Sequence, residues 1–204
     1  MSSIPYHLRE LSIQESSLLP ITLTPGARVL DVGCGIGQVL MQLPPSMARF
    51  GVDLDAAAIE YGRKQFPQLQ LAVAAGEALP FCNEQFDVVL CRVALPYMDV
   101  PKALQEFHRV CRPRAALWLT LHPWHMAWER IKTRGWKDRI YQTYALFNGL
   151  LLHYCGVVIR FPLQSSRIES IQTESGIQRA LQRAGFNDIQ VDRSRRFEVI
   201  ARKS

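Results

Sequence analysis

Short apolar runs alternate with stretches of helical periodicity along most of the chain. In the helical stretches the apolar residues recur three or four positions apart, as Leu104, Phe107 and Cys111 do. This alternation is typical of βαβ units and predicts a parallel sheet in an α/β fold. The runs predicted to be buried strands are Arg28–Val32, Arg49–Asp53, Leu69–Val73, Phe86–Cys91 and Ala115–Leu121.

The pattern breaks after the fifth strand and resumes near residue 170. A helix over Glu174–Ala184 is predicted to end at Gly185, which suits a C-terminal cap, and two last strands cover 189–191 and 197–201. We therefore predict one domain over residues 1–204 with a helical N-terminal segment, 1–27. The insertion, 122–170, is expected to form a lid over the substrate.

The composition is that of an ordinary folded protein, with 48% hydrophobic and 21% charged residues among 204. The first twenty residues lack the pattern of a signal peptide, so a cytoplasmic location is expected. The five cysteines are scattered and form no Cys-x-x-Cys pair. Neither a disulfide framework nor a metal site is therefore predicted.

Positive charge is concentrated in the second half of the chain. Residues 1–120 hold 10 Lys or Arg and 11 Asp or Glu, whereas residues 121–204 hold 14 and 7. The excess clusters at 130–139 and 193–203. A solvated basic surface is the favoured interpretation, and attraction to nucleic acid, a lipid headgroup or an acidic substrate is the alternative.

The most informative stretch is VLDVGCGIGQ, residues 29–38, in which a strand leads into three alternate glycines. A dinucleotide-binding Gly-x-Gly-x-x-Gly loop would need its third glycine at position 38, which is Gln38. The carboxylate of Asp31 would repel a diphosphate but would suit a cationic group such as the ammonium of a methionine moiety. Asp53 follows Gly33 by 20 residues and could accept hydrogen bonds from ribose hydroxyls. Together these features predict an adenosyl ligand with a positive end.

Four segments resemble successive motifs of class I S-adenosylmethionine-dependent methyltransferases, and in particular the type 11 (UbiE-like) group. The resemblance covers residues 28–121 well and 174–201 more loosely. It implies a Rossmann-like fold, with a seven-stranded, mostly parallel sheet and helices on both faces, and S-adenosyl-L-methionine as cofactor. The segments are VLDVGCGIGQ, GVDLDAAAIEYGRK, GEALPFCNEQFDVVLCRVALPYMD and EFHRVCRP.

The resemblance also implies roles for individual residues. The methionine end of the cofactor would lie against Asp31, Gly33, Cys34, Gly35 and Gly37. Asp53 would take the ribose hydroxyls, and Leu54 and Gly76 would lie near the adenine, whereas Cys91 and Arg92 would run beside the methionine moiety.

Two positions depart from the family pattern. Ala75 stands where an aspartate usually accepts from the adenine amino group, so that contact is either missing or replaced by Glu77. The usual Pro-Gly-Gly turn before the fifth strand is Pro113-Arg114-Ala115, which affects the turn more than the site.

Candidate bases follow the fourth and fifth strands. Tyr97, His122 and His125 could each accept a proton from a methyl acceptor, although a structural role for each is the alternative. A base is needed only where the acceptor must lose a proton, because the sulfonium methyl is already electrophilic.

The helix predicted at 140–155 is either a packing element or a lid over the site, and it is too short and too interrupted to span a membrane. A lid would suit a lipophilic or aromatic acceptor, presented at a membrane surface that attracts 130–139. The residues expected to share the inner helix face are Ile140, Tyr144, Phe147, Leu151 and Cys155, with Trp124, Trp128 and Trp136 completing the lid.

The sequence thus predicts a methyltransferase for a small apolar or aromatic molecule, and leaves the acceptor and the oligomeric state open. An RNA methyltransferase is disfavoured because no RNA-binding module is appended, and no DNA partner is expected. A protein that binds S-adenosylmethionine without turnover is a further alternative.

Overall fold

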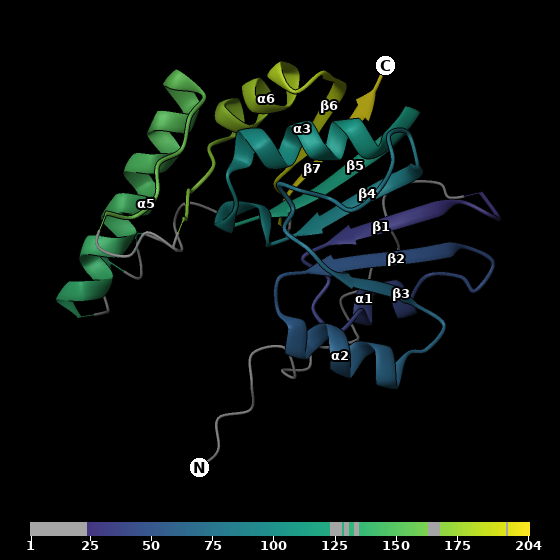
Figure 1. Ribbon diagram of the computed structural model, residues 1–204. Helices are drawn as coiled ribbons and strands as arrows, with labels where there is room; N and C mark the ends of the chain where they lie inside the picture. Colours follow the sequence, from purple (N-terminus) through teal and green to yellow (C-terminus); the bar gives the residue numbers. More distant parts are fainter. Residues whose placement is uncertain (1–23, 123–127, 129–130, 133–134, 163–167, 195) are drawn as a thin grey trace, which may run out of the picture.

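A seven-stranded sheet forms the centre of the protein, in the strand order β3-β2-β1-β4-β5-β7-β6 (Figure 1). The computed structural model describes residues 24–122, 128, 131–132, 135–162, 168–194 and 196–204. The strands are β1 (Arg28–Val32), β2 (Ala48–Asp53), β3 (Gln70–Val73), β4 (Phe86–Arg92), β5 (Cys111–Leu121), β6 (Phe186–Asp192) and β7 (Phe197–Lys203).

Strands β1 to β5 run parallel, whereas β7 is antiparallel to both of its neighbours, β5 and β6. The predicted fold class, a mostly parallel seven-stranded sheet, is therefore confirmed. The strand order reverses direction between β1 and β4, so the carboxyl ends of these strands meet at a topological switch point, where open α/β sheets bind ligands.

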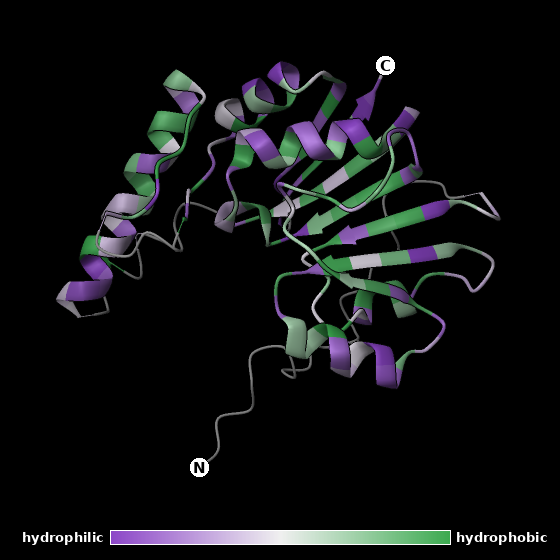
Figure 2. Cartoon of the chain, viewed as in Figure 1, coloured by the Kyte–Doolittle hydropathy of each residue, from purple (hydrophilic) through white to green (hydrophobic). Residues whose placement is uncertain are grey.

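Helices cover both faces of the sheet (Figure 1). One face carries α1 (Gln38–Met41) and α2 (Ala56–Gln65), and the other carries α3 (Val100–Val110) and α6 (Glu174–Arg183). A short 3₁₀ helix, η3 (Leu95–Tyr97), connects β4 to α3. The apolar segments in Figure 2 run along the strands, where each face packs against its own pair of helices.

Local chemistry explains where the helices around the site begin. The side chain of Asp55 accepts hydrogen bonds from the amides of Ala57 and Ala58, and Asp99 accepts one from the amide of Lys102. These are N-terminal caps, and they fix the residues at which α2 and α3 begin. Helix α1 is a single turn, because the glycine loop occupies the residues before it.

The departure from Pro-Gly-Gly before β5 has a visible consequence. Arg114 adopts a φ of 66°, in the left-handed region that glycine reaches more easily. Strand β5 nevertheless begins at Cys111, immediately after α3 and four residues before the predicted start. Arg114 therefore lies within the first residues of β5, far from the strand's carboxyl end.

The described part of the insertion is dominated by α5 (Trp136–Cys155), a 20-residue helix that stands beside the sheet in Figure 1. Asn148 is fully buried: its amide nitrogen donates to the carbonyls of Ile159 and Glu169, and its oxygen accepts from the amide of Ile159. A side chain at Gly149 would place its Cβ 2.0 Å from the carbonyl oxygen of Ile171. One side of α5 therefore packs closely on the segment that follows it.

The predicted inner face of this helix was wrong in part. Tyr144 is buried, but Ile140, Phe147 and Cys155 are exposed. The buried set instead contains Asn148 and other polar or small residues, because the helix packs against chain whose backbone groups need hydrogen-bond partners. The buried residues of α5 are Gln142, Tyr144, Ala145, Asn148, Gly149 and Leu152.

Candidate S-adenosylmethionine site

The glycine loop follows β1 at the switch point of the sheet. Gly33, Gly35 and Gly37 all have positive φ, of 79°, 55° and 91°. The loop is held by the carbonyl of Val52, which accepts from the amides of Gly33 (2.8 Å) and Cys34 (3.0 Å). A Cβ at Gly33 would lie 2.3 Å from the Cβ of Ala94, so a side chain at Gly33 would force β1 and the loop after β4 apart.

Asp53, at the end of β2, is tied to this loop. Its Oδ2 accepts from the amide of Gly35 at 2.8 Å, and its Oδ1 accepts from the amide of Asp55 at 2.9 Å. Each carboxylate oxygen can accept more than one hydrogen bond, and Asp53 is only half-buried. The carboxylate therefore positions the loop and keeps capacity for a ligand hydroxyl, the role predicted for it.

Asp31, at the end of β1, is almost completely buried, with 2% of its surface exposed. Burial raises the pKa of its carboxyl from 3.8 to about 7; the nearby Arg92 lowers this pKa, and Asp53 raises it. The sequence analysis assumed an ionised carboxylate here. Near neutral pH without a ligand, both protonation states are instead populated, and a cationic group alongside would favour the ionised one.

Arg92 and two cysteines surround this carboxylate. The guanidinium carbon of Arg92 lies 6.0 Å from the ring centroid of Trp118, and its buried Nε has no hydrogen-bond partner among the described residues. Cys34 and Cys91 are buried, and burial raises the pKa of both thiols. Both cysteines are therefore neutral wall residues and not nucleophiles.

The predicted adenine side lies beyond β3. Leu54 is 70% exposed, so its side chain is available to pack against a ligand. Gly76 is buried, and a Cβ there would lie 2.6 Å from the sulfur of Met98, a wall residue that the sequence analysis did not identify. Glu77 accepts from the amide of Asp99 at 2.8 Å, at the start of α3, and Ala75 is half-buried. One oxygen of Glu77 thus has a structural role.

Two of the three candidate bases lie together. The hydroxyl oxygen of Tyr97 is 3.4 Å from Nε2 of His122, and their rings are packed edge to face with centroids 6.1 Å apart. Tyr97 ends η3 and His122 directly follows β5, so the carboxyl ends of two adjacent strands create the pair. The third candidate, His125, lies outside the described residues, as does Trp124.

The end of the insertion also reaches this place, which the sequence did not indicate. The amide of Ser170 donates to the carbonyl of Pro96, at 2.9 Å, beside Tyr97. Ser170, Gln172 and Thr120 are buried polar residues, and the Oγ1 of Thr120 has no hydrogen-bond partner among the described residues. No periodicity predicts the burial of Ser170 and Gln172, because it depends on the insertion folding back onto η3.

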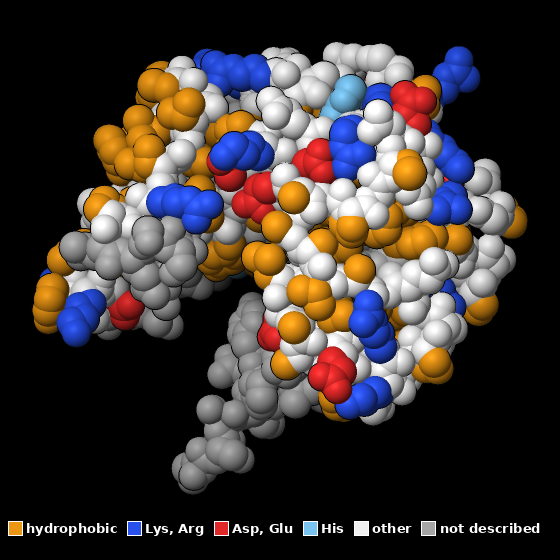
Figure 3. Space-filling view, in the orientation of Figure 1, with side chains coloured by type: hydrophobic (Ala, Val, Ile, Leu, Met, Phe, Trp, Pro, Cys, Tyr) orange, Lys and Arg blue, Asp and Glu red, His pale blue; other side chains and the backbone are white. Residues whose placement is uncertain are grey.

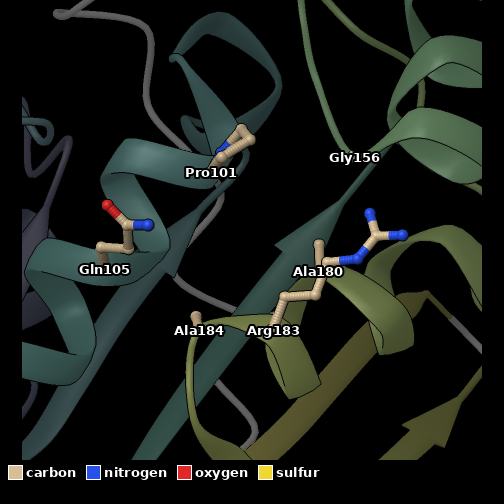
Figure 4. Close-up of a pocket in the computed structure, with 6 residues that line it drawn as sticks. All are labelled: Pro101, Gln105, Gly156, Ala180, Arg183 and Ala184. Atoms are coloured by element: carbon tan, nitrogen blue, oxygen red, sulfur yellow. The ribbon is translucent and has the colours of Figure 1, made fainter.

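The two remaining tryptophans expected in the lid are exposed. Trp128 is 48% exposed and Trp136 is 68% exposed. A separate shallow hollow lies between α3, α6 and the end of α5 (Figure 4), and none of the predicted cofactor residues lines it. The residues around this hollow are Pro101, Gln105, Gly156, Ala180, Arg183 and Ala184.

The loop geometry fits an adenosyl cofactor. A Cβ built on Gly35 would meet no atom within 4 Å, so the space in front of Gly35 is open. Residues 30–119 match a family model described as a methyltransferase domain. This segment is a type 11 methyltransferase domain. The cofactor of such domains is S-adenosylmethionine, as the sequence resemblance implied.

Curated relatives are similar to this chain over about half of its length. An uncharacterized methyltransferase, YodH of Bacillus subtilis, is 32% identical over 54% of this chain and 50% of its own length. The 2-phytyl-1,4-naphtoquinone methyltransferase of Nostoc punctiforme is 34% identical over 44% of each chain. The matched region thus spans about half the length of these curated relatives.

A solved structure supports the fold over more of the chain. The S-adenosylmethionine-dependent methyltransferase of Methanosarcina mazei superimposes with a TM-score of 0.59, covers 89% of this chain and 94% of its own, and is 20% identical. At this identity the likeness establishes the fold alone. No helix among the described residues is both long and apolar enough to cross a bilayer.

Proposed function

We propose that the protein transfers the methyl group of S-adenosylmethionine to a small, apolar or aromatic acceptor that carries an ionisable hydroxyl or an acidic C–H. The observation that carries this proposal is the Tyr97–His122 pair, which lies one 3₁₀ turn from the glycine loop. Ala94 contacts Gly33, and the carbonyl of Ala94 accepts from the amide of Tyr97 at 3.0 Å. The pair is therefore held close to the methionine end of the predicted cofactor site.

Each residue then has a defined task. Asp31 and Asp53 bind the ammonium and the ribose hydroxyls, and the Gly33–Ala94 contact fixes the distance between the cofactor loop and the acceptor. His122 accepts the acceptor's proton at Nε2 while Tyr97 orients either the imidazole or the acceptor oxygen. Bound S-adenosylmethionine supplies a methyl group on a cationic sulfur. The acceptor's electron pair forms the new bond as the sulfur–carbon bond breaks.

The kind of acceptor is suggested by the relatives and by the surroundings. The Nostoc relative is named for a phytyl naphthoquinone, an aromatic ring with a lipid tail. In this chain the exposed residue of η3 is Tyr97, an aromatic ring with a polar hydroxyl, whereas Leu95 and Pro96 are buried. A reduced quinone offers a hydroxyl for His122 and a ring carbon as nucleophile, so we propose this class.

Methyl transfer to a prenylated naphthoquinol tests the proposal. Labelled S-adenosylmethionine is incubated with the protein and the quinol. The product is then extracted and identified by its mass in a mass spectrometer. We expect His122→Gln to lower kcat by about 10²- to 10⁴-fold and Tyr97→Phe to lower it less. Both variants should bind S-adenosylhomocysteine as the unaltered protein does. Tyr61→Phe, an exposed tyrosine on α2, is the matched control.

Two results would contradict the proposal. Full activity of His122→Gln would remove that histidine from proton transfer. Tight binding of S-adenosylhomocysteine without methyl transfer to naphthoquinols, phenols or a cell-lipid extract would favour a protein that binds the cofactor without turnover.

A further inference from the structure

Helix α5 carries a continuous row of side chains on the side that faces away from the domain. The row, here called the outer stripe, has spacings that alternate between four and three, and it covers about 27 Å of helix. Its five apolar members are between 45% and 71% exposed. In Figure 3 hydrophobic side chains gather over this helix. The outer stripe consists of Trp136, Ile140, Thr143, Phe147, Leu150 and Tyr154.

The opposite side of α5 already has its partners. Asn148 and Gly149 hold the segment that follows the helix, and Nδ1 of His153 is 2.8 Å from Oγ1 of Thr173, the cap of α6. These contacts fix the helix to the domain without using the outer stripe. Large exposed apolar surfaces mark interaction sites, so the outer stripe needs an occupant.

The charge around the outer stripe indicates what that occupant is. Residues 130–160 contain six Lys or Arg and one acidic residue, Asp138, whereas Thr143–Ile159 contains no charged side chain. At the basic end two lysines lie against exposed indoles: the Nζ of Lys132 is 5.8 Å from the ring centroid of Trp128, and the Nζ of Lys137 is 5.6 Å from that of Trp136. A basic, aromatic end therefore continues into an uncharged apolar face.

A second copy of the chain matches this pattern poorly. The spacing would suit a coiled-coil seam, but Lys137 and Arg139 flank it at one end. Parallel pairing would oppose these cations to their copies, and antiparallel pairing would oppose them to the uncharged end around His153. The one carboxylate of α5, Asp138, lies between these two cations, so either arrangement leaves positive charge in excess. An anionic lipid bilayer matches both features, because its headgroups attract the basic end and its acyl chains receive the apolar face.

We propose that the outer stripe docks α5 flat on an anionic lipid bilayer, with Phe147 and Tyr154 reaching the acyl chains and Lys132 and Lys137 at the phosphates. The docking rests on α5 and on the basic residues just before it, and it adds a partner to the proposed function. Because the segment after α5 is hydrogen-bonded to Pro96, beside Tyr97, a docked helix holds the candidate site at the surface from which a lipid-soluble acceptor arrives.

Vesicle flotation with the full chain tests the docking. The vesicles contain either phosphatidylcholine alone or phosphatidylcholine with about one-third phosphatidylglycerol. We expect the protein to float with the anionic vesicles and to be released by high salt. The double variant Phe147→Gln, Tyr154→Gln should bind at least about tenfold more weakly, and Tyr61→Gln on α2 should bind within about twofold of the unaltered protein.

A charge variant separates the electrostatic contribution to vesicle binding from the apolar contribution. Lys132→Gln with Lys137→Gln should lower binding to anionic vesicles by about fivefold per lysine and leave binding to neutral vesicles unchanged. Absence of the unaltered protein from the floated anionic vesicles would overturn the proposal. A dimer in sedimentation equilibrium that Phe147→Gln, Tyr154→Gln dissociates would also overturn it, and would assign the outer stripe to a second copy. Calorimetry of S-adenosylhomocysteine on the same variants, expected to be unchanged, keeps this test separate from that of the proposed function.

Discussion

Replacing Asp31 with asparagine should change how cofactor binding depends on pH. In the ligand-free protein burial raises the pKa of this carboxyl from 3.8 to about 7, a difference that corresponds to about 4 kcal/mol. In the proposed site the ammonium of S-adenosylhomocysteine binds the ionised carboxylate, so binding below neutral pH would require a proton to leave. The Kd should therefore rise by about tenfold for each pH unit below 7 and level off above about 8.

Isothermal titration calorimetry with S-adenosylhomocysteine between pH 5.5 and pH 8.5 measures this dependence. Asp31→Asn should bind more weakly at pH 8 and lose most of the slope, whereas Asp188→Asn, an exposed aspartate on β6, should keep it. Arg92→Met removes the charge that lowers the pKa of Asp31, so its midpoint should move to higher pH. An unchanged slope in Asp31→Asn would refute the reasoning, because no ionised Asp31 would then be needed.

The same pKa predicts the stability of the ligand-free protein. The folded state holds the Asp31 proton up to about pH 7, whereas the unfolded chain releases it near pH 4. Stability should therefore fall as the pH rises from about 4 to about 7, and the loss should be complete above that range. Asp31→Asn should accordingly be more stable than the unaltered protein at pH 8, by up to about 4 kcal/mol in urea unfolding, and equal to it at pH 4.

Three further substitutions test other parts of the structure. Gly33→Ala should abolish S-adenosylhomocysteine binding in calorimetry, because the new Cβ would clash with Ala94. Adding Ala94→Gly should restore the binding except for about 1 kcal/mol of backbone strain at position 33. Failure of this rescue would show that the clash is not the cause. Asp53→Ala should weaken binding by about 1–3 kcal/mol, and unchanged affinity would remove Asp53 from the site. Asn148→Leu should lower the free energy of unfolding by about 2–4 kcal/mol, because the buried carbonyl of Glu169 and the amide of Ile159 lose their partner. A smaller loss would mean that water replaces the lost partner.

The sheet was predictable because its strands are continuous apolar runs. Strand β1 matches its predicted range, Arg28–Val32, and β2 and β3 differ from theirs by one residue. Asp55 and Asp99 fix the starts of α2 and α3 through local hydrogen bonds. Local hydrogen bonds and apolar periodicity were sufficient to predict the elements that pack within or against the sheet.

The insertion was less predictable because its burial depends on distant chain. Phe147 is more hydrophobic than Asn148, yet Asn148 is the buried residue, since it satisfies backbone groups at positions 159 and 169. In the candidate site, the sequence identified Tyr97 and His122 separately, but only the fold shows them 3.4 Å apart. The raised pKa of Asp31 likewise comes from burial that no local motif reveals.

A crystal structure of the protein with S-adenosylhomocysteine tests the central claim most directly. The account predicts the ammonium within hydrogen-bonding distance of Asp31, the ribose hydroxyls on Asp53, and the sulfur facing the side on which Tyr97 and His122 meet. A dinucleotide diphosphate bound in the glycine loop in competition with S-adenosylhomocysteine, or the homocysteine tail pointing away from Asp31, would contradict it.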